Sequence, residues 1–182
     1  MKIALTGSHG TGKTTLAYEL TAELKKHGIN ATMCTEVARK CPFPIHRKGN
    51  FQSQLWIFVT QIKDELEAEK DYEFVVCDRS VLDTYAYTKY LLTSADTERL
   101  WAFARENLKT YDLLFKTPII DSYIIEDGVR DTDKKFQQDI DAILNKFLNE
   151  SKIPYIELPK TNQLKFILDK IAILMPQHFK EI

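Results

Sequence analysis

The sequence contains few cysteines, no long apolar run and almost no net charge. Its three cysteines form no Cys-x-x-Cys pair and their number is odd, which argues against a disulfide framework or a zinc site and favours a reducing cytoplasm. No apolar run approaches the roughly 18 residues of a transmembrane helix, and the apolar start is too short for a signal peptide. The net charge of −1 counts against a broad nucleic-acid-binding face.

The composition favours a single globular domain over residues 1–182. Hydrophobic residues make up 44% of the chain, and it contains no Gly/Ser tract, charge block or repeat, which is typical of one packed core. Short apolar runs predict strands at Lys2–Thr6, Ala31–Val37, Phe74–Cys77, Leu113–Phe115 and Pro154–Leu158. Helical spacing predicts helices at Lys13–His27, Asn50–Lys70, Val81–Leu92, Thr97–Lys109, Asp133–Glu150 and Asn162–Met175. The alternation predicts an α/β fold in which helices cover both faces of a parallel sheet.

A glycine-rich segment follows the first predicted strand. Residues 7–14 read GSHGTGKT, which matches the P-loop pattern GxxxxGK[ST]. The glycines let backbone N–H groups turn towards phosphate oxygens, and the next helix points the positive end of its dipole at them. Lys13 would reach the β- and γ-phosphates, and the Thr14 hydroxyl would ligate Mg²⁺. The residues predicted to bind ATP are Gly7, Ser8, His9, Gly10, Thr11, Gly12, Lys13, Thr14 and Thr15.

Acidic residues lie at the carboxyl ends of two other predicted strands, at the edge of the sheet where ligands bind. Asp78 is predicted to hold Mg²⁺ with Thr14, directly or through water, and the alternative is a cap on the next helix. Glu36 is predicted to take the proton of an acceptor hydroxyl, and Arg39 to bind an anionic group. The alternative for these two residues is an exposed ion pair of little energetic value.

The helix predicted from Asn50 mixes aromatic and amide side chains on one face. These side chains belong to Phe51, Gln54, Phe58 and Gln61. The mixture is typical of a pocket for a planar ring, in which aromatics stack and amides form hydrogen bonds. The alternative, packing on the sheet, is favoured for Phe58.

A candidate lid lies at about residues 121–133. It contains Glu126-Asp127-Gly128-Val-Arg130, in which Asp-Gly is also a hairpin-turn signal. The functional hypothesis is that Arg130 closes over the transferring phosphate and stabilises its charge.

A P-loop is shared by ATPases, GTPases and kinases, and other features choose among them. The guanine-binding pattern Asn-Lys-x-Asp is absent, since residues 145–148 read NKFL. A motor ATPase would normally be a larger chain. A small P-loop domain with an acidic residue after its second strand favours a small-molecule kinase.

The order of these motifs resembles the AAA-like P-loop kinases that include the NadR-type ribosylnicotinamide kinase domain. The matching segments are GSHGTGKTT, TEVAR, VVCDRS with Asp83, YDLLF and EDGVR. The DRS segment, residues 78–80, is also similar to deoxynucleoside and thymidylate kinases, whose acid and arginine serve metal and substrate. The resemblance implies a P-loop NTPase fold with a five-stranded parallel core, ATP with Mg²⁺ as cofactors, and a substrate role for Arg79.

The sequence therefore predicts ATP- and Mg²⁺-dependent phosphoryl transfer to a hydroxyl or phosphate of a small nucleoside-like or nucleotide-like acceptor. The predicted catalytic residues are Lys13, Glu36, Asp78 and Arg130. The predicted acceptor-binding residues are Glu36, Arg39, Gln54, Phe58 and Arg79. Two alternatives stay open: a nucleotide-dependent switch or binding module, and a kinase that acts on modified nucleotides in nucleic acid. We expect no membrane partner, and a homodimer is compatible with this prediction.

Overall fold

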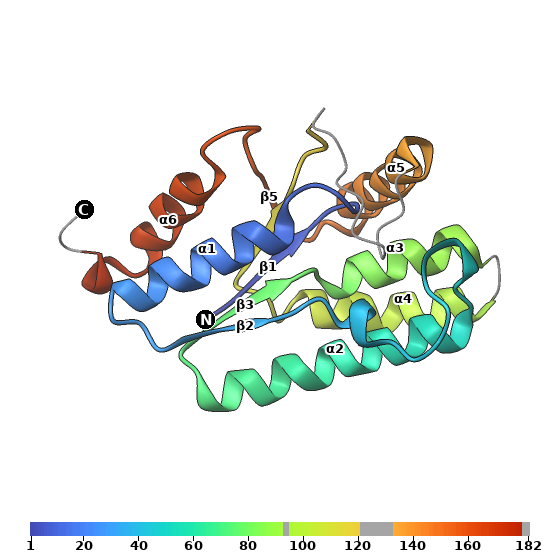
Figure 1. The fold of residues 1–182 in the computed structure, drawn as a ribbon, viewed down its shortest axis with the longest axis horizontal. Coiled ribbons are helices and arrows are strands. Elements are labelled where there is room, and N and C mark those ends of the chain that lie inside the picture. The colour runs from blue at the N-terminus through green and yellow to red at the C-terminus, as the bar shows by residue number, and fades with distance from the viewer. Residues whose placement is uncertain (93–94, 121–132, 180–182) are drawn as a thin grey trace.

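The computed structural model describes residues 1–92, 95–120 and 133–179, and every structural statement below refers to these residues (Figure 1). They contain the strands β1 (Lys2–Thr6), β2 (Ala31–Cys34), β3 (Phe74–Asp78), β4 (Leu113–Lys116) and β5 (Ile156–Glu157). These form a parallel sheet in the order β2-β3-β1-β4-β5. Parallel neighbours need long crossover connections, which helices supply here. The P-loop therefore leaves the carboxyl end of the central strand.

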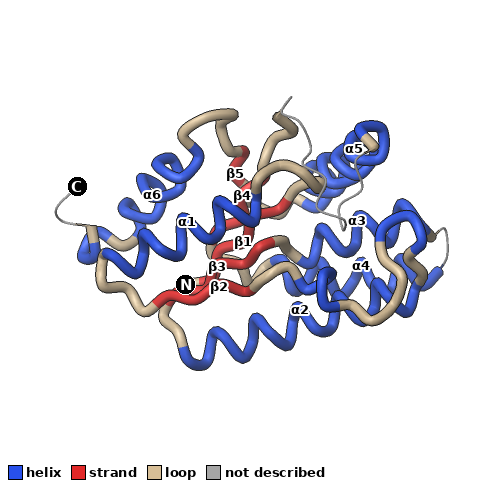
Figure 2. The backbone as a smooth tube through the Cα atoms, in the orientation of Figure 1, coloured by secondary structure: helices blue, strands red, loops and turns tan. Residues whose placement is uncertain are grey.

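Helices cover both faces of the sheet, as predicted. The described residues form α1 (Lys13–Lys26), α2 (Phe51–Asp71), α3 (Val81–Leu91), α4 (Ala95–Leu108), α5 (Lys134–Ser151) and α6 (Gln163–Leu174). Helices α1 and α6 pack on one face, and α2, α3, α4 and α5 lie on the other (Figure 2). None of the helices in the described ranges is long and apolar enough to cross a bilayer.

Successive residues of the central strands enter opposite halves of the core. In β1, Ile3 and Leu5 pack with α1 and α6, whereas Ala4 packs with the helices of the other face. In β3, Val75 and Cys77 join that second group. Because both faces are buried, these strands are apolar at almost every position, which is why they read as continuous apolar runs in the sequence.

Side-chain caps determine where the two helices nearest the site begin. The Asn50 side chain accepts a hydrogen bond from Ser53 N at 2.9 Å, which confirms the predicted start of α2. At α3, Ser80 is the N-cap and Asp83 accepts from Ser80 N at 2.8 Å, which is the reciprocal arrangement of a capping box. The alternative in which Asp78 caps this helix is therefore wrong.

Strand β2 is shorter than predicted. The apolar run predicts a strand over Ala31–Val37, but β2 ends at Cys34 and Val37–Lys40 form a short 3₁₀ helix. β2 is an edge strand that pairs only with β3, and this pairing stops at Cys34 opposite Cys77. Glu36 consequently occupies the N-cap position of the 3₁₀ helix and leaves the sheet. Two further 3₁₀ segments lie at His46–Lys48 and Pro176–His178.

Candidate active site

The P-loop joins β1 to α1 through backbone conformations that favour glycine. Gly10 and Gly12 have φ of 70° and 82°, the left-handed region that residues with a side chain rarely adopt. Gly7 has φ 153°, and a Cβ at this position would lie 2.2 Å from Thr117 Oγ1. The close approach of Thr117 therefore requires glycine at the first position of the motif.

Lys13 is buried in the centre of this loop, at 4% exposure. Its ammonium group donates to the Ser8 carbonyl oxygen and, at 3.0 Å, to Thr11 Oγ1. Burial, followed by the nearby charge of Arg79, lowers the pKa of Lys13 to about 8. Oxygens of the loop thus hold the ammonium group in the position from which it would meet phosphate oxygens.

A cavity opens over the P-loop. Its lining includes residues 9–14, together with Glu36, Arg39, Asp78 and Arg79. The structure therefore brings together most of the predicted ATP-binding and catalytic residues. Ser8 contributes its carbonyl oxygen to Lys13 instead, and Thr15 is exposed on the first turn of α1, outside the cavity lining.

Asp78 and Thr14, the two residues predicted to hold Mg²⁺, contact each other directly. Thr14 Oγ1 donates to Asp78 Oδ2 at 2.7 Å. Asp78 Oδ1 is buried and has no hydrogen-bond partner among the described residues. Burial raises the pKa of Asp78. A buried carboxylate oxygen without a donor, beside a threonine hydroxyl, fits the hard oxygen ligands that Mg²⁺ prefers.

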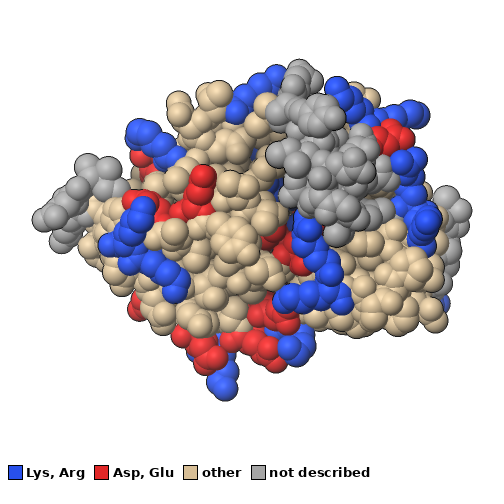
Figure 3. Space-filling view, viewed as in Figure 1, with Lys and Arg blue, Asp and Glu red and all other residues tan. Residues whose placement is uncertain are grey.

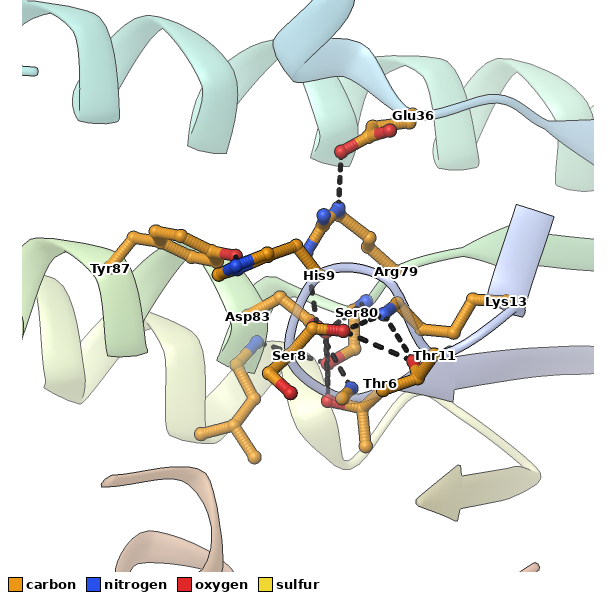
Figure 4. A network of polar contacts seen from close by, with 12 residues as sticks. Thr6, Ser8, His9, Thr11, Lys13, Glu36, Arg79, Ser80, Asp83 and Tyr87 are labelled. Atoms are coloured by element: carbon orange, nitrogen blue, oxygen red, sulfur yellow. Dashed lines mark hydrogen bonds and ion pairs between the residues drawn. The ribbon is translucent and has the colours of Figure 1, made fainter. Parts of the chain in front are cut away.

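Glu36 lies between two guanidinium groups. Arg79 Nε donates to Glu36 Oε1 at 2.6 Å (Figure 4). Arg39 Nε donates to Glu36 Oε2 at 3.0 Å. Burial acts to raise the pKa of Glu36, but Arg79, Lys13 and Arg39 outweigh it and lower the pKa to about 2. The Glu36 side chain is 11% exposed, so the alternative of an exposed ion pair is wrong for this carboxylate.

Arg79 contacts both sides of the site. Its guanidinium carbon lies 5.5 Å from the centre of the Tyr87 ring, and the Tyr87 hydroxyl lies 3.0 Å from His9 Nδ1 in the P-loop. Figure 4 shows the Tyr87 and His9 side chains next to each other, beside the Arg79–Glu36 pair. The sequence pattern identified Arg79 only through a family resemblance and did not identify Tyr87.

Asp83 is a second residue that sequence reasoning missed as part of the site. Its carboxylate accepts from Thr6 Oγ1 at 2.8 Å, Gly7 N at 3.0 Å and both the backbone N–H and hydroxyl of Ser80. These contacts tie the start of α3 to the start of the P-loop. The signal available in the sequence was the spacing Ser80-x-x-Asp83, which is typical of a capping box.

A second cavity adjoins the first. The two share Glu36, Ala38, Ile45 and Arg79 in their linings. The rest of the second lining is Gln54, Ile57, Asp83, Thr84 and Tyr87. The ion pair of Glu36 with Arg79 therefore lies in the wall between the P-loop cavity and a less polar chamber.

The predicted ring-binding face of α2 is only partly correct. Gln54 lines the second cavity, as expected. Phe58 does not line either cavity and is buried in the core against α3. The alternative prediction, that Phe58 packs in the core, is therefore correct, and its prediction as an acceptor-binding residue is not supported. Gln61 is buried and donates to Glu65 and to the Arg79 carbonyl. The candidate lid with Arg130 lies outside the described residues.

Comparisons with known proteins agree with this fold. A family model described as an AAA domain matches residues 2–163. No curated protein matches the chain significantly. Among solved structures, NadR protein in complex with NR aligns with a TM-score of 0.76 and 22% identity over 94% of this chain and 50% of that one. NadR with NAD and AMP-PNP aligns with a TM-score of 0.73 and 19% identity over 94% and 48%.

A deoxyadenosine kinase also shares the fold over its full length. The M. mycoides enzyme with dCMP and dCDP bound aligns with a TM-score of 0.71 and 18% identity, over 95% of this chain and 100% of that one. The present chain spans about half the length of the NadR chains. At these identities the likeness establishes a shared fold, and the residues of the site carry the functional argument.

Proposed function

This chain belongs to the AAA domain family, and from that premise we propose that it is a kinase that transfers a phosphoryl group from ATP to a small nucleoside-like or nucleotide-like acceptor. The observation that carries the proposal is the pair of adjoining cavities with Glu36 and Arg79 in their shared wall. A nucleotide in the P-loop cavity and an acceptor in the second chamber would meet at these two side chains. Holding both reactants in contact is the main requirement of phosphoryl transfer.

The P-loop residues would bind the phosphates of ATP. Lys13 would exchange its contacts with Ser8 and Thr11 for phosphate oxygens, and the N–H groups at the start of α1 would donate to the same oxygens. Mg²⁺, when bound, would neutralise charge on the β- and γ-phosphates, and Thr14 and Asp78 would hold it. Asp78 Oδ1, which has no hydrogen-bond partner within the described part of the chain, supports this assignment.

Glu36 and Arg79 would organise the transfer itself. A carboxylate whose pKa is about 2 is a weak base, so Glu36 would first orient the acceptor hydroxyl by accepting its hydrogen bond. As the acceptor oxygen bonds to the γ-phosphorus and the bond to ADP breaks, Arg79 would turn towards the phosphoryl oxygens. That shift would raise the pKa of Glu36, whose carboxylate would then take the proton that the acceptor hydroxyl releases.

The second chamber favours a neutral planar acceptor. Gln54 can both donate and accept hydrogen bonds, as an amide-bearing ring requires, and Ile57 supplies an apolar wall. The charged groups in this lining are Glu36 with Arg79, which form an ion pair, and Asp83, which already accepts four hydrogen bonds. Arg39 at the P-loop cavity and Arg130 of the predicted lid complete the proposed set of anion-binding residues.

A mass-spectrometric screen of nucleosides and nucleoside monophosphates with ATP and Mg²⁺ tests the proposal. We expect one class of acceptor to gain a phosphoryl group. Lys13→Ala should lower kcat/KM by about a hundredfold or more because it removes charge from the transition state, and Glu36→Gln should abolish transfer while ATP still binds. Lys165→Ala, which removes an exposed lysine from α6, is the matched control. ATP binding without any phosphorylated acceptor would instead favour a nucleotide-dependent switch.

The face of the molecule shown in Figure 3 gives no particular support to a nucleic-acid substrate. Basic and acidic side chains are interspersed on the face shown in Figure 3, whereas binding to a polyanion needs a continuous basic area. Salt-dependent binding to DNA would revive that alternative. A cytoplasmic location and a homodimer stay predictions.

A further inference from the structure

The turn after β3 holds Arg79 in an unusual backbone conformation. Arg79 has φ 90°, and its guanidinium is buried against Glu36. A non-glycine residue in such a conformation is strained and persists only where surrounding contacts fix it. The contacts that fix this turn therefore decide where the Arg79 side chain lies.

The first of these contacts comes from α2. Gln61 Nε2 donates to the Arg79 carbonyl oxygen at 3.1 Å and to Glu65 Oε1 at 3.0 Å. Gln61 and Glu65 are buried, at 6% and 2% exposure. Glu65 thus orients the amide group of Gln61, which in turn holds the peptide of Arg79.

The second contact reaches the other side of the same turn. The Tyr111 hydroxyl donates to Glu65 Oε1 at 2.8 Å and accepts from Val81 N at 3.3 Å. Val81 is two residues after Arg79, at the start of α3. One carboxylate oxygen of Glu65 therefore supports both ends of the turn, through two different side chains.

The second carboxylate oxygen of Glu65 forms an ion pair with Lys2. Lys2 Nζ lies 3.3 Å from Glu65 Oε2 and 3.1 Å from Glu69 Oε2. A buried carboxylate that is fully paired in this way can hold its hydrogen-bond donors in one geometry. Glu65, Gln61 and Tyr111 are absent from the linings of both cavities, so none of them would touch a bound reactant there.

We propose that Glu65, acting through Gln61 and Tyr111, is a positioning residue that fixes the turn after β3 so that Arg79 meets Glu36 between the two cavities. In this proposal the hydrogen bonds of Glu65, Gln61 and Tyr111 determine where the Arg79 guanidinium lies, and the guanidinium takes part in phosphoryl transfer. The effect on catalysis rests on the proposed kinase function, whereas the effect on Arg79 does not.

Two conservative variants test the network with matched controls. Gln61→Leu removes the donor to the Arg79 carbonyl, and Tyr111→Phe removes the hydroxyl that bridges Glu65 and Val81. The control for the second is Tyr85→Phe, because the Tyr85 hydroxyl is buried without a hydrogen-bond partner among the described residues. The control for the first is Gln163→Leu, whose amide donates to the Pro159 carbonyl at 3.0 Å beside α6.

The direct readout is the Nε–H signal of Arg79 in a ¹⁵N–¹H NMR spectrum, assigned by its loss in Arg79→Lys. In the unaltered protein the short bond to Glu36 should protect this hydrogen from exchange. We expect exchange at least about tenfold faster in Gln61→Leu and Tyr111→Phe, and no change in either control. With an acceptor from the screen, kcat should fall about tenfold to a hundredfold while KM for ATP changes little.

The two readouts separate this inference from the proposed function. Faster exchange at Arg79 without any identified acceptor would support the positioning role while the kinase assignment failed. A lower melting temperature with Arg79 exchange and kcat equal to those of the controls would overturn it, because the network would then be structural only. A fall in kcat with unchanged Arg79 exchange would overturn it as well.

Discussion

Single side chains in this protein owe their properties to neighbours that are distant in the sequence. Glu36 and Arg79 are 43 positions apart, yet they form the 2.6 Å bond on which the candidate site is built. Asp78 is adjacent to Arg79 in the chain but has a raised pKa, whereas the pKa of Glu36 is lowered. Burial dominates for Asp78, and neighbouring cations dominate for Glu36.

The low pKa of Glu36 predicts a pH-dependent contribution to stability. Unfolding returns the pKa to about 4.3, so the Glu36 contribution is present above that pH and declines as the pH falls towards the folded value. The contribution could reach about 3 kcal/mol near neutral pH, with about half lost at pH 3. Urea denaturation of the unaltered protein and Glu36→Gln should show a stability difference that narrows from pH 7 to pH 3. A constant difference would contradict the buried ion pair.

Gly7 and Gly28 offer a matched test of close packing at the P-loop. Both have positive φ, but a Cβ at Gly7 would meet Thr117 Oγ1 at 2.2 Å, whereas a Cβ at Gly28 would meet nothing within 4 Å. We expect Gly7→Ala to destabilise the protein by about 2–4 kcal/mol, and Gly28→Ala by about 1 kcal/mol from backbone strain alone. Thermal denaturation of both variants checks this. Equal losses would mean that Thr117 moves aside easily.

Secondary-structure elements place the site through their ends. The P-loop follows the end of β1, Asp78 ends β3, and the capping box at the start of α3 joins these two points through Asp83. The predicted elements were correct in kind and order, because the apolar periodicity of buried strands and helices is local. The predicted end of β2 was wrong, because an edge strand ends where its pairing with the neighbouring strand ends, and the sequence does not show that point.

The capping box of α3 should matter more than an ordinary helix cap. Asp83 accepts hydrogen bonds from Gly7 N as well as from Ser80 N. In Asp83→Asn, the NH₂ group of the amide would face one of these N–H donors and could not accept its hydrogen bond. We expect the free energy of unfolding to fall by about 2–4 kcal/mol and ADP to bind more weakly. Asp169→Asn, on the exposed face of α6, is the control. Chemical denaturation and calorimetric titration with ADP measure the two effects, and normal ADP affinity in a destabilised Asp83→Asn would restrict Asp83 to capping.

The molecule as a unit should respond to its nucleotide. A ligand that binds only the folded state stabilises it by about 2.7 kcal/mol at a concentration of 100 Kd, which corresponds to about 5–10 °C in a chain of this size. We expect Mg²⁺ with ATP to raise the melting temperature, and EDTA to reduce that rise.

Asp78→Asn should separate stability from ion binding. Replacing a buried carboxylate, one of whose oxygens has no hydrogen-bond partner among the described residues, should leave the nucleotide-free protein equally or more stable, while the Mg²⁺-dependent part of the shift is lost. Differential scanning fluorimetry measures both. An undiminished Mg²⁺ effect in Asp78→Asn would exclude this residue as the ligand.

The sequence by itself determined the alternation of strands and helices, the P-loop and the carboxylates near the ends of β2 and β3, since each depends on local spacing or on a short motif. Only the tertiary structure decided which side chains meet. In the folded chain Phe58 is buried in the core, Gln61 donates a hydrogen bond to the Arg79 carbonyl oxygen, and Tyr87 and Asp83 lie at the site. A helical period predicts that residues share a face, but it does not say which neighbour that face meets, because packing partners come from distant segments of the chain.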